Sequence, residues 1–356
     1  MTLSESKGAP LLPASRPAAP LLDIRDLEVH YRRRRGDPVL RASDRVSLEV
    51  SSGETVGVVG ESGSGKSTVA KAALGLAPVH AGQIHLAGRD ITRLGPRGRR
   101  DLSRIMQVVF QDPNASLNPY LTVGRSLAEP LEVHGVRPGP ELRQRVADAL
   151  ERVGLSPEAA GRFPAQFSGG QKQRLAIARA LIVDPQLVIC DEAVSALDLS
   201  IQAQILNLLV EQQRGRQLSY LFISHDIEVV RYISDRIYVM YLGQVMETGA
   251  ASAVTGRPAH PYTQELLDSA PVADPRVQRR RNAAEAARKA LRPVASTTAV
   301  THPTGGCPFA PRCTYAIEVC RAESPPLVAT DAGGLTACHR YPEWQTLHAQ
   351  GGGATV

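Results

Sequence analysis

Short runs of apolar residues recur along the chain, and each is followed at once by glycine or polar residues. Uninterrupted runs of this length are typical of strands buried on both faces of a sheet. The runs lie at residues 56–59, 108–110, 187–190 and 220–223. Stretches with apolar residues at helical spacing lie at 68–74 and 172–181. This order of strands and helices predicts one large α/β domain.

A glycine-rich stretch joins the run at 56–59 to the helical stretch at 68–74. Its residues are Gly60, Glu61, Ser62, Gly63, Ser64, Gly65, Lys66 and Ser67, and Thr68 follows them. The glycines let backbone N–H groups approach an anion, Lys66 supplies a charge for the β and γ phosphates, and the Ser67 hydroxyl is placed to bind Mg²⁺. A turn with an incidental lysine is the alternative. The flanking strand and helix favour a phosphate-binding loop, so we expect a nucleoside triphosphate.

Two carboxylates, Asp191 and Glu192, end the apolar run at 187–190. In nucleotide-binding α/β sheets the first carboxylate at such a strand end typically organises Mg²⁺ through water, and a second can take a proton from the attacking water. The alternative is that both merely end a strand at the surface. Together with the phosphate-binding loop, they predict a site for nucleotide hydrolysis.

Four residues open the helical stretch at 172–181, and they are Ser168, Gly169, Gly170 and Gln171. Free N–H donors and the positive end of a helix dipole suit a second phosphate contact. The same residues also make an ordinary helix start, so this prediction depends on the other motifs.

The order of these motifs resembles that of the ABC ATPase family. The phosphate-binding loop is followed by Gln111, residues 168–171, Asp191 with Glu192, residues 195–198 and residues 223–226. The resemblance implies an α/β fold of the P-loop NTPase class, an ABC-type nucleotide-binding domain. It would have a RecA-like α/β core, an antiparallel β subdomain and an α-helical subdomain at about residues 112–166.

The resemblance also implies roles for single residues. Glu192 resembles the general base, His225 the switch that contacts the γ-phosphate, and Gln111 the residue that couples the γ-phosphate and Mg²⁺ to the helical subdomain. Tyr31 lies where the family has an aromatic residue that stacks on adenine, although a buried core tyrosine is the alternative. Two such domains resemble halves of a head-to-tail sandwich, in which residues 168–171 of one close over the ATP of the other.

Three further stretches, 111–119, 195–204 and 260–267, resemble the ATPase subunits of dipeptide and oligopeptide importers. Ala193 departs from that pattern, which usually has proline after the catalytic glutamate. The resemblance implies an ATP-hydrolysing subunit for the import of peptides or related solutes. The alternatives are the ATPase of an exporter and, from another class, an ABC ATPase that acts on DNA or ribosomes.

The partners that this resemblance implies are two transmembrane permeases, a second ABC ATPase subunit and, through the permeases, an extracytoplasmic solute-binding protein. The second ATPase can be a paralogue or another copy of this chain. No stretch approaches 18 consecutive apolar residues, so we expect no membrane span and a peripheral place on the cytoplasmic face of the inner membrane. Runs of arginine, such as 32–35, lie far apart without interleaved aromatic residues, and we expect no nucleic acid.

Four of the five cysteines, Cys307, Cys313, Cys320 and Cys338, fall within the last fifty residues. Disulfides are disfavoured in the cytosol, so a metal centre is the better interpretation. Resemblance to the peptide-importer ATPases suggests a [4Fe–4S] cluster held by all four thiolates, with Zn²⁺ or unmetallated buried cysteines as alternatives. Cys190 is interpreted as a small apolar strand residue.

The resemblance, together with shifts in composition, implies that the chain has five parts. We expect a disordered tail at 1–20, the ABC ATPase domain at 21–270, a linker at 271–306, a cysteine-rich module at 307–345 and a flexible tail at 346–356. The tail to residue 20 is rich in Pro, Ala and Ser and lacks the apolar centre of a secretory signal.

Overall fold

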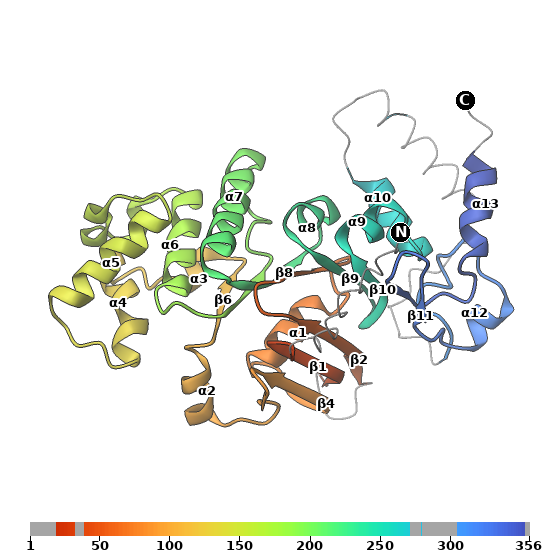
Figure 1. Cartoon of the computed structure of the whole chain (residues 1–356), viewed down its shortest axis with the longest axis horizontal. Helices are drawn as coiled ribbons and strands as arrows, with labels where there is room; N and C mark the ends of the chain where they lie inside the picture. The colour runs from red at the N-terminus through yellow and green to blue at the C-terminus, as the bar shows by residue number, and fades with distance from the viewer. Residues whose placement is uncertain (1–18, 33–38, 271–278, 280–304, 353–356) are drawn as a thin grey trace, which may run out of the picture.

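The computed structural model describes residues 19–32, 39–270, 279 and 305–352. Most of the N-terminal tail and almost all of the linker predicted at 271–306 lie outside the described residues. The described parts form a central sheet, a second smaller sheet, a group of helices at one end and a C-terminal segment at the other (Figure 1).

The central sheet has eight strands in the order β11-β12-β10-β9-β3-β8-β7-β6. Strands β9, β3, β8, β7 and β6 run parallel, whereas β10, β12 and β11 pair antiparallel. Every residue of β3, β7 and β8 is buried, which is why these strands are nearly continuous apolar runs in the sequence. The bounds are β3 (Thr55–Val59), β6 (Met106–Phe110), β7 (Leu187–Asp191), β8 (Ser219–Ser224), β9 (Arg236–Tyr241), β10 (Gln244–Ala250), β11 (Val328–Ala329) and β12 (Leu335–Thr336).

Helices follow the parallel strands and cover the central sheet. Helix α1 (Lys66–Ala73) follows β3, α6 (Gly169–Leu181) precedes β7, α7 (Leu199–Arg216) precedes β8 and α8 (Ile227–Ile233) follows it. Helices α9 (Ala251–Gly256) and α10 (Pro261–Ser269) come after β10. The alternation of strand and helix confirms the α/β class that the apolar pattern predicts.

The second sheet is antiparallel and lies beside α1 (Figure 1). Its four strands have the order β2-β1-β4-β5. Their inward side chains share one apolar cluster with Val69 and Ala73 of α1. The bounds are β1 (Leu22–Tyr31), β2 (Leu40–Val50), β4 (Val79–Leu86) and β5 (Arg89–Asp90).

The stretch between β6 and α6 is helical and forms the left-hand end of the molecule in Figure 1. Leu127 and Leu131 of α4 share an apolar cluster with Val146 and Leu150 of α5, which closes this group on α6. The elements here are α3 (Pro113–Ser116), α4 (Val123–Val133), α5 (Pro140–Arg152) and two 3₁₀ turns, Pro157–Gly161 and Pro164–Gln166, with α2 (Pro96–Leu102) before β6.

The C-terminal segment, residues 305–352, joins the central sheet directly. Strand β12 pairs with β10, with Thr336 opposite Glu247, and Thr336 is fully buried. The segment also contains α12 (Glu318–Ala322) and α13 (Glu343–Gly352). The buried Trp344 of α13 donates its indole N–H to the carbonyl of Ala259 at 2.9 Å. The C-terminal segment therefore packs against the sheet.

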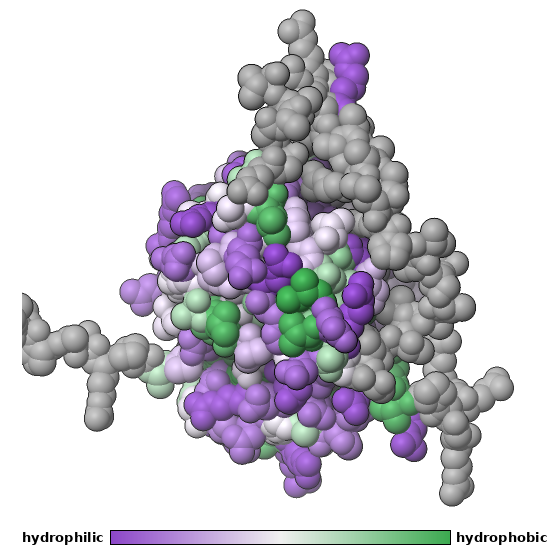
Figure 2. All heavy atoms as spheres, turned by 90° about the vertical axis from the view of Figure 1, so that its right-hand side faces the viewer, coloured by the Kyte–Doolittle hydropathy of each residue, from purple (hydrophilic) through white to green (hydrophobic). Residues whose placement is uncertain are grey.

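Figure 2 shows the face that carries this segment. Apolar side chains appear there as separate spots on a mostly polar surface, outside the atoms drawn in grey. Exposed apolar residues of the segment are Ile317, Leu327, Val328, Leu335 and Leu347. Val328 and Leu335 lie on the paired strands β11 and β12, and a few exposed apolar residues are ordinary on a protein surface.

Candidate active site

The carboxyl ends of four parallel strands meet at one edge of the central sheet. Phe110 of β6 and Ile223 of β8 both lie opposite Asp191 of β7, and Val59 of β3 lies opposite Ser224. The next residues along the four strands therefore emerge at the same edge. They are Gln111, Glu192, His225 and Gly60.

The loop after β3 is shaped by glycines that no other residue could replace. Gly60 has φ +159° and Gly65 has φ +97°, which L-residues rarely adopt. A Cβ on Gly60 would lie 2.1 Å from the carbonyl oxygen of Met240, and one on Gly65 would lie 2.2 Å from that of Ala42. The loop therefore packs tightly against its neighbours while its backbone turns into α1.

Lys66 is the first residue of α1, and its side chain folds back over the loop. It is 3% exposed, and its Nζ donates to the carbonyls of Gly60 at 2.8 Å and Glu61 at 2.9 Å, and to Ser64 Oγ at 3.3 Å. Burial lowers the pKa of this ammonium group, whereas the nearby carboxylates of Glu192 and Asp191 act in the opposite direction. A phosphate chain wrapped by this loop would meet the lysine charge directly.

Ser67 and Asp191 form an oxygen pair suited to Mg²⁺. The Ser67 hydroxyl donates to Asp191 Oδ1 at 2.6 Å, and Asp191 is 8% exposed. Mg²⁺ prefers hard oxygen ligands, usually one or two protein oxygens together with substrate phosphates and water. A hydroxyl and a carboxylate in contact beside a phosphate-binding loop fit that donor set.

Glu192 holds an unusual backbone conformation. Its φ is +52°, in the left-handed region that non-glycine residues rarely occupy, and such strain tends to occur at functional sites. Its N–H donates to the Ile223 carbonyl at 3.0 Å, and its carbonyl accepts from the Ser195 hydroxyl at 2.9 Å. Its carboxylate lies 3.9 Å from His225 Nδ1. The turn thus holds the carboxylate beside the imidazole at the sheet edge.

Residues 168–171 begin α6. Ser168 Oγ accepts from the N–H of Gln171 at 3.4 Å, and Gln171 Oε1 accepts from the N–H of Ser168 at 3.0 Å, which is a capping box. Ser168 and Gly169 are exposed, whereas a Cβ on Gly170 would lie 2.6 Å from Ile201 Cγ2. In Figure 1, α6 lies among the helices near α4 and α5, apart from α1. The structure therefore presents this helix start outward and does not bring it to the loop at 60–67.

Tyr31 is the last residue of β1. It is half-buried and packs against the apolar cluster shared by the antiparallel sheet and α1. Gln111 and Thr68 are less enclosed, since Gln111 is exposed and Thr68 is half-buried on α1.

Four thiols line one pocket in the C-terminal segment, together with Phe309, Tyr315 and His260. Burial raises the pKa of Cys307 and of Cys313 to about 11 and that of Cys338 to about 12. The fourth is Cys320, whose carbonyl accepts from the N–H of Cys307 at 2.7 Å. Cys190 lies in β7, away from this pocket, and is completely buried, as expected of an apolar strand residue.

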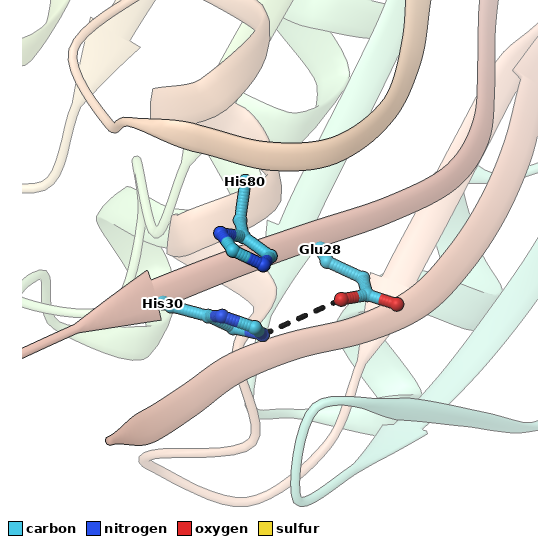
Figure 3. Close-up of side chains that lie close together, drawn as sticks. All are labelled: Glu28, His30 and His80. Atoms are coloured by element: carbon cyan, nitrogen blue, oxygen red, sulfur yellow. Dashed lines mark ion pairs between the residues drawn. The ribbon is translucent and has the colours of Figure 1, made fainter.

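Another group of potential ligands lies on the antiparallel sheet. Glu28, His30 and His80 bring one ligand atom each within 4.8 Å of one another (Figure 3). The imidazoles of His30 and His80 stack with centroids 4.1 Å apart and planes inclined by 28°, so their nitrogen lone pairs run nearly side by side. Lone pairs so aligned converge poorly on one ion, and His80 is exposed. We therefore do not assign a metal site to these three residues.

Sequence reasoning missed the contacts of Glu61. Its N–H donates to the Tyr262 hydroxyl at 2.9 Å, and its carboxylate accepts two hydrogen bonds from Arg312. Both partners are more than 200 positions away in the sequence. Tyr262 belongs to the recognised stretch 260–267, but nothing in the pattern indicated that it reaches the phosphate-binding loop.

A family model described as "ABC transporter" matches residues 43–195, and one described as "Oligopeptide/dipeptide transporter, C-terminal region" matches residues 246–320. The fold and the site therefore define an ATP-binding cassette ATPase. Among the described residues, every helix is too short or too polar to cross a membrane.

Curated relatives narrow this class. A probable peptide ABC transporter ATP-binding protein of Sinorhizobium fredii is 45% identical over 324 residues, which cover 90% of this chain and 89% of the relative. A Brucella abortus protein, provisionally named as a peptide import ATP-binding protein, is 46% identical over 322 residues, 89% of this chain and 92% of the relative. The chain belongs to the family of peptide ABC transporter ATP-binding proteins.

Solved structures also resemble this chain, and they are ATP-binding cassettes or parts of ABC transporters. A dimeric ATP-binding cassette bound to ADP and Pi in a post-hydrolysis state has a TM-score of 0.59 and 29% identity, covering 65% of this chain and 98% of that one. A Clostridium perfringens protein that is part of an ABC transporter complex has a TM-score of 0.61 and 26% identity, covering 75% and 99%.

Proposed function

We propose that this ATPase powers the import of dipeptides, oligopeptides or related solutes. The observation that carries the proposal is the match of residues 246–320 to the C-terminal region of oligopeptide and dipeptide transporters, in a chain that also has the whole set of site residues. Export is the alternative, because the permeases and not the ATPase subunit determine the direction of transport.

In the proposed mechanism the loop at 60–67 and Lys66 bind the phosphates of ATP, and Ser67 and Asp191 bind Mg²⁺ with Gln111 nearby. Glu192 takes a proton from the attacking water, and His225 contacts the γ-phosphate. The strand register supports this assignment, because it brings these side chains to one sheet edge. Tyr31, which is half-buried at the end of β1, is proposed to stack on adenine.

The complete site is proposed to form between two ATPase subunits. Ser168 and Gly169 are exposed at the start of α6, where free N–H groups and the helix dipole favour a phosphate. They would close over the ATP of a second subunit, either a paralogue or another copy of this chain. Because sandwich closure must favour ATP over ADP, contacts to the γ-phosphate would drive the cycle.

Two permeases are proposed to dock in a groove between the helical end and the central sheet. The groove has a volume of about 270 Å³ and is lined by Val108 and Phe110 of β6, Val133 and His134 at the end of α4, and Arg179 of α6. Phe110, which lines the groove, directly precedes Gln111 in the chain. A permease segment bound in the groove could therefore respond to changes at the nucleotide site. This arrangement would hold the chain at the cytoplasmic face of the inner membrane, with a solute-binding protein on the other side.

The four cysteines are proposed to bind a [4Fe–4S] cluster. All four line one pocket, and thiolates are the ligands that such clusters prefer. Thiolates also bind tetrahedral Zn²⁺, which is the alternative occupant of this pocket.

The transport proposal is tested by purifying the tagged chain from native membranes and identifying its partners by mass spectrometry. Two permeases, a sister ATPase and a solute-binding protein are expected. Recovery of ribosomal or DNA-repair proteins would overturn it. For the groove, Val133→Asp should release the permeases, whereas the control Leu327→Asp, exposed on the C-terminal segment, should not.

The cluster is tested by anaerobic purification followed by measurement of iron, acid-labile sulfide and zinc. About four irons and four sulfides per chain are expected from a [4Fe–4S] cluster, with loss of both in Cys320→Ser. One zinc per chain without sulfide would contradict the cluster and support the alternative.

A further inference from the structure

Arg312, in the C-terminal segment, reaches the phosphate-binding loop. Its guanidinium forms a two-pronged contact with Glu61, with Nη1 donating to Oε2 at 2.7 Å and Nη2 to Oε1 at 2.8 Å. Nη2 also donates to Glu265 of α10 at 2.5 Å. Since Arg312 directly precedes Cys313, the contact joins the cysteine pocket to the loop at 60–67.

The surroundings of Arg312 fix its direction. The guanidinium carbon lies 5.6 Å from the ring centres of both Tyr241 and Phe309, and the Arg312 side chain is 29% exposed. Phe309 and Tyr262 are buried, and the Tyr262 hydroxyl accepts the N–H of Glu61. Backbone and side chain of Glu61 are thus held from outside the loop.

The charge of Glu61 is the reason that this contact matters for ATP. The residue lies within the loop that wraps the phosphates, and its carboxylate would repel a nucleotide with several negative charges. Two-pronged contacts between arginine and carboxylate combine neutralisation with fixed geometry, and they are stronger than neutral hydrogen bonds. The hydrogen bonds that Arg312 donates to Glu61 raise the pKa of the guanidinium above its ordinary value, and its positive charge is therefore constant at working pH.

We propose that Arg312 is a positioning residue for ATP, which neutralises and orients Glu61 and makes the C-terminal segment part of the nucleotide site. The proposal rests on ATP binding at the loop and not on the identity of the transported solute. Any change that pulls the stretch around Cys313 away from the loop therefore weakens ATP binding.

The experiment is a double-mutant cycle on the full chain, with Kd measured by titration of a fluorescent ATP analogue and KM and kcat measured separately. Arg312→Gln should raise Kd and KM by about tenfold and change kcat little, as expected for a binding contact. In the Glu61→Gln background the same substitution should change Kd by less than about twofold, because no carboxylate is left to repel the phosphates. The Kd of Arg312→Lys should lie between that of the natural chain and that of Arg312→Gln, since lysine keeps the charge but cannot make the two-pronged contact.

Two controls separate this role from mere folding. Arg321→Gln removes one charge from an exposed position of the same segment and should leave Kd unchanged. Trp344, the only tryptophan, is buried where the segment meets Ala259, so its fluorescence reports docking of the segment. An unchanged Kd in Arg312→Gln would overturn the proposal. So would an equal loss in the Glu61→Gln background, or a loss that always accompanies exposure of Trp344.

Discussion

The Ser67 hydroxyl donates a 2.6 Å hydrogen bond to Asp191 and so connects the start of α1 to the end of β7. The two residues are 124 positions apart in the sequence. Their contact places a helix-borne hydroxyl and a strand-borne carboxylate at one point of the sheet edge, where they can share a metal ion with the phosphates.

Asp191→Asn should lower the rate of ATP hydrolysis and raise the Mg²⁺ concentration that hydrolysis requires. The amide keeps the hydrogen bond but loses the charge that attracts Mg²⁺, and loss of a metal-organising group typically costs 10- to 100-fold, roughly, in metal affinity or activity. ATPase rates measured against Mg²⁺ concentration check this. An unchanged Mg²⁺ requirement would place the ion elsewhere.

Glu192→Gln should lower kcat by about 10²- to 10⁴-fold, the usual contribution of a general base, while ATP still binds. Glutamine preserves the size of the side chain at this strained turn, so the fold is expected to remain. Single-turnover hydrolysis together with ATP titration separates the two effects. Equal loss of binding and hydrolysis would instead indicate that the turn had collapsed.

Gly170→Ala should destabilise the protein, whereas Gly169→Ala should not. A Cβ at 170 meets Ile201 Cγ2 at 2.6 Å, and overpacking of this kind costs about 1–3 kcal/mol. A Cβ at 169 meets nothing within 4 Å, and alanine restricts the unfolded chain more than glycine does, which stabilises the protein by about 0.4–1 kcal/mol. The Tm values of the two variants should therefore move in opposite directions, and equal shifts would rule out the packing explanation.

Glu247 should make stability depend on pH. The residue is 2% exposed, and burial raises the pKa of its carboxyl group from 4.5 to about 7. Between these values the folded chain keeps a proton that the unfolded chain releases, so the stabilisation is complete below about pH 4.5 and is lost as pH rises through 7.

The variant Glu247→Gln cannot titrate at this position. The Tm of the natural chain should therefore fall relative to that of the variant from pH 5 to pH 8, by the equivalent of roughly 3 kcal/mol at most. A Tm difference that stays constant across this range would show that the carboxyl group keeps one protonation state.

Much of the core could be predicted from the sequence because its signals are local. The strands β3, β7 and β8 are continuous apolar runs, and glycine spacing identifies the loop at 60–67. Strands β9 and β10 are separated by a turn that contains Gly243, so a local glycine marks this boundary too. In a parallel sheet, the residues that follow the strands lie together at the carboxyl edge of the sheet. Identifying the strand ends in the sequence therefore identifies most of the site.

Other features depend on contacts between distant segments and leave no local pattern. The left-handed conformation of Glu192 follows from its neighbours across the sheet. It could not be predicted from the sequence, because the residue with the positive φ is not a glycine. Strand β12 is only two residues long, too short to show any periodicity. The contact between Arg312 and Glu61 spans 251 positions between two charged residues that, read alone, resemble ordinary surface residues.

Pairing of β12 with β10 also has a consequence for solubility. Without β12, the backbone donors and acceptors of β10 around Glu247 would form an open sheet edge, the kind of template on which chains aggregate. A chain cut after α10 would keep its phosphate-binding loop but expose this edge. Pairing with β12 covers this part of the edge, and release of the C-terminal segment would expose it to edge-to-edge association.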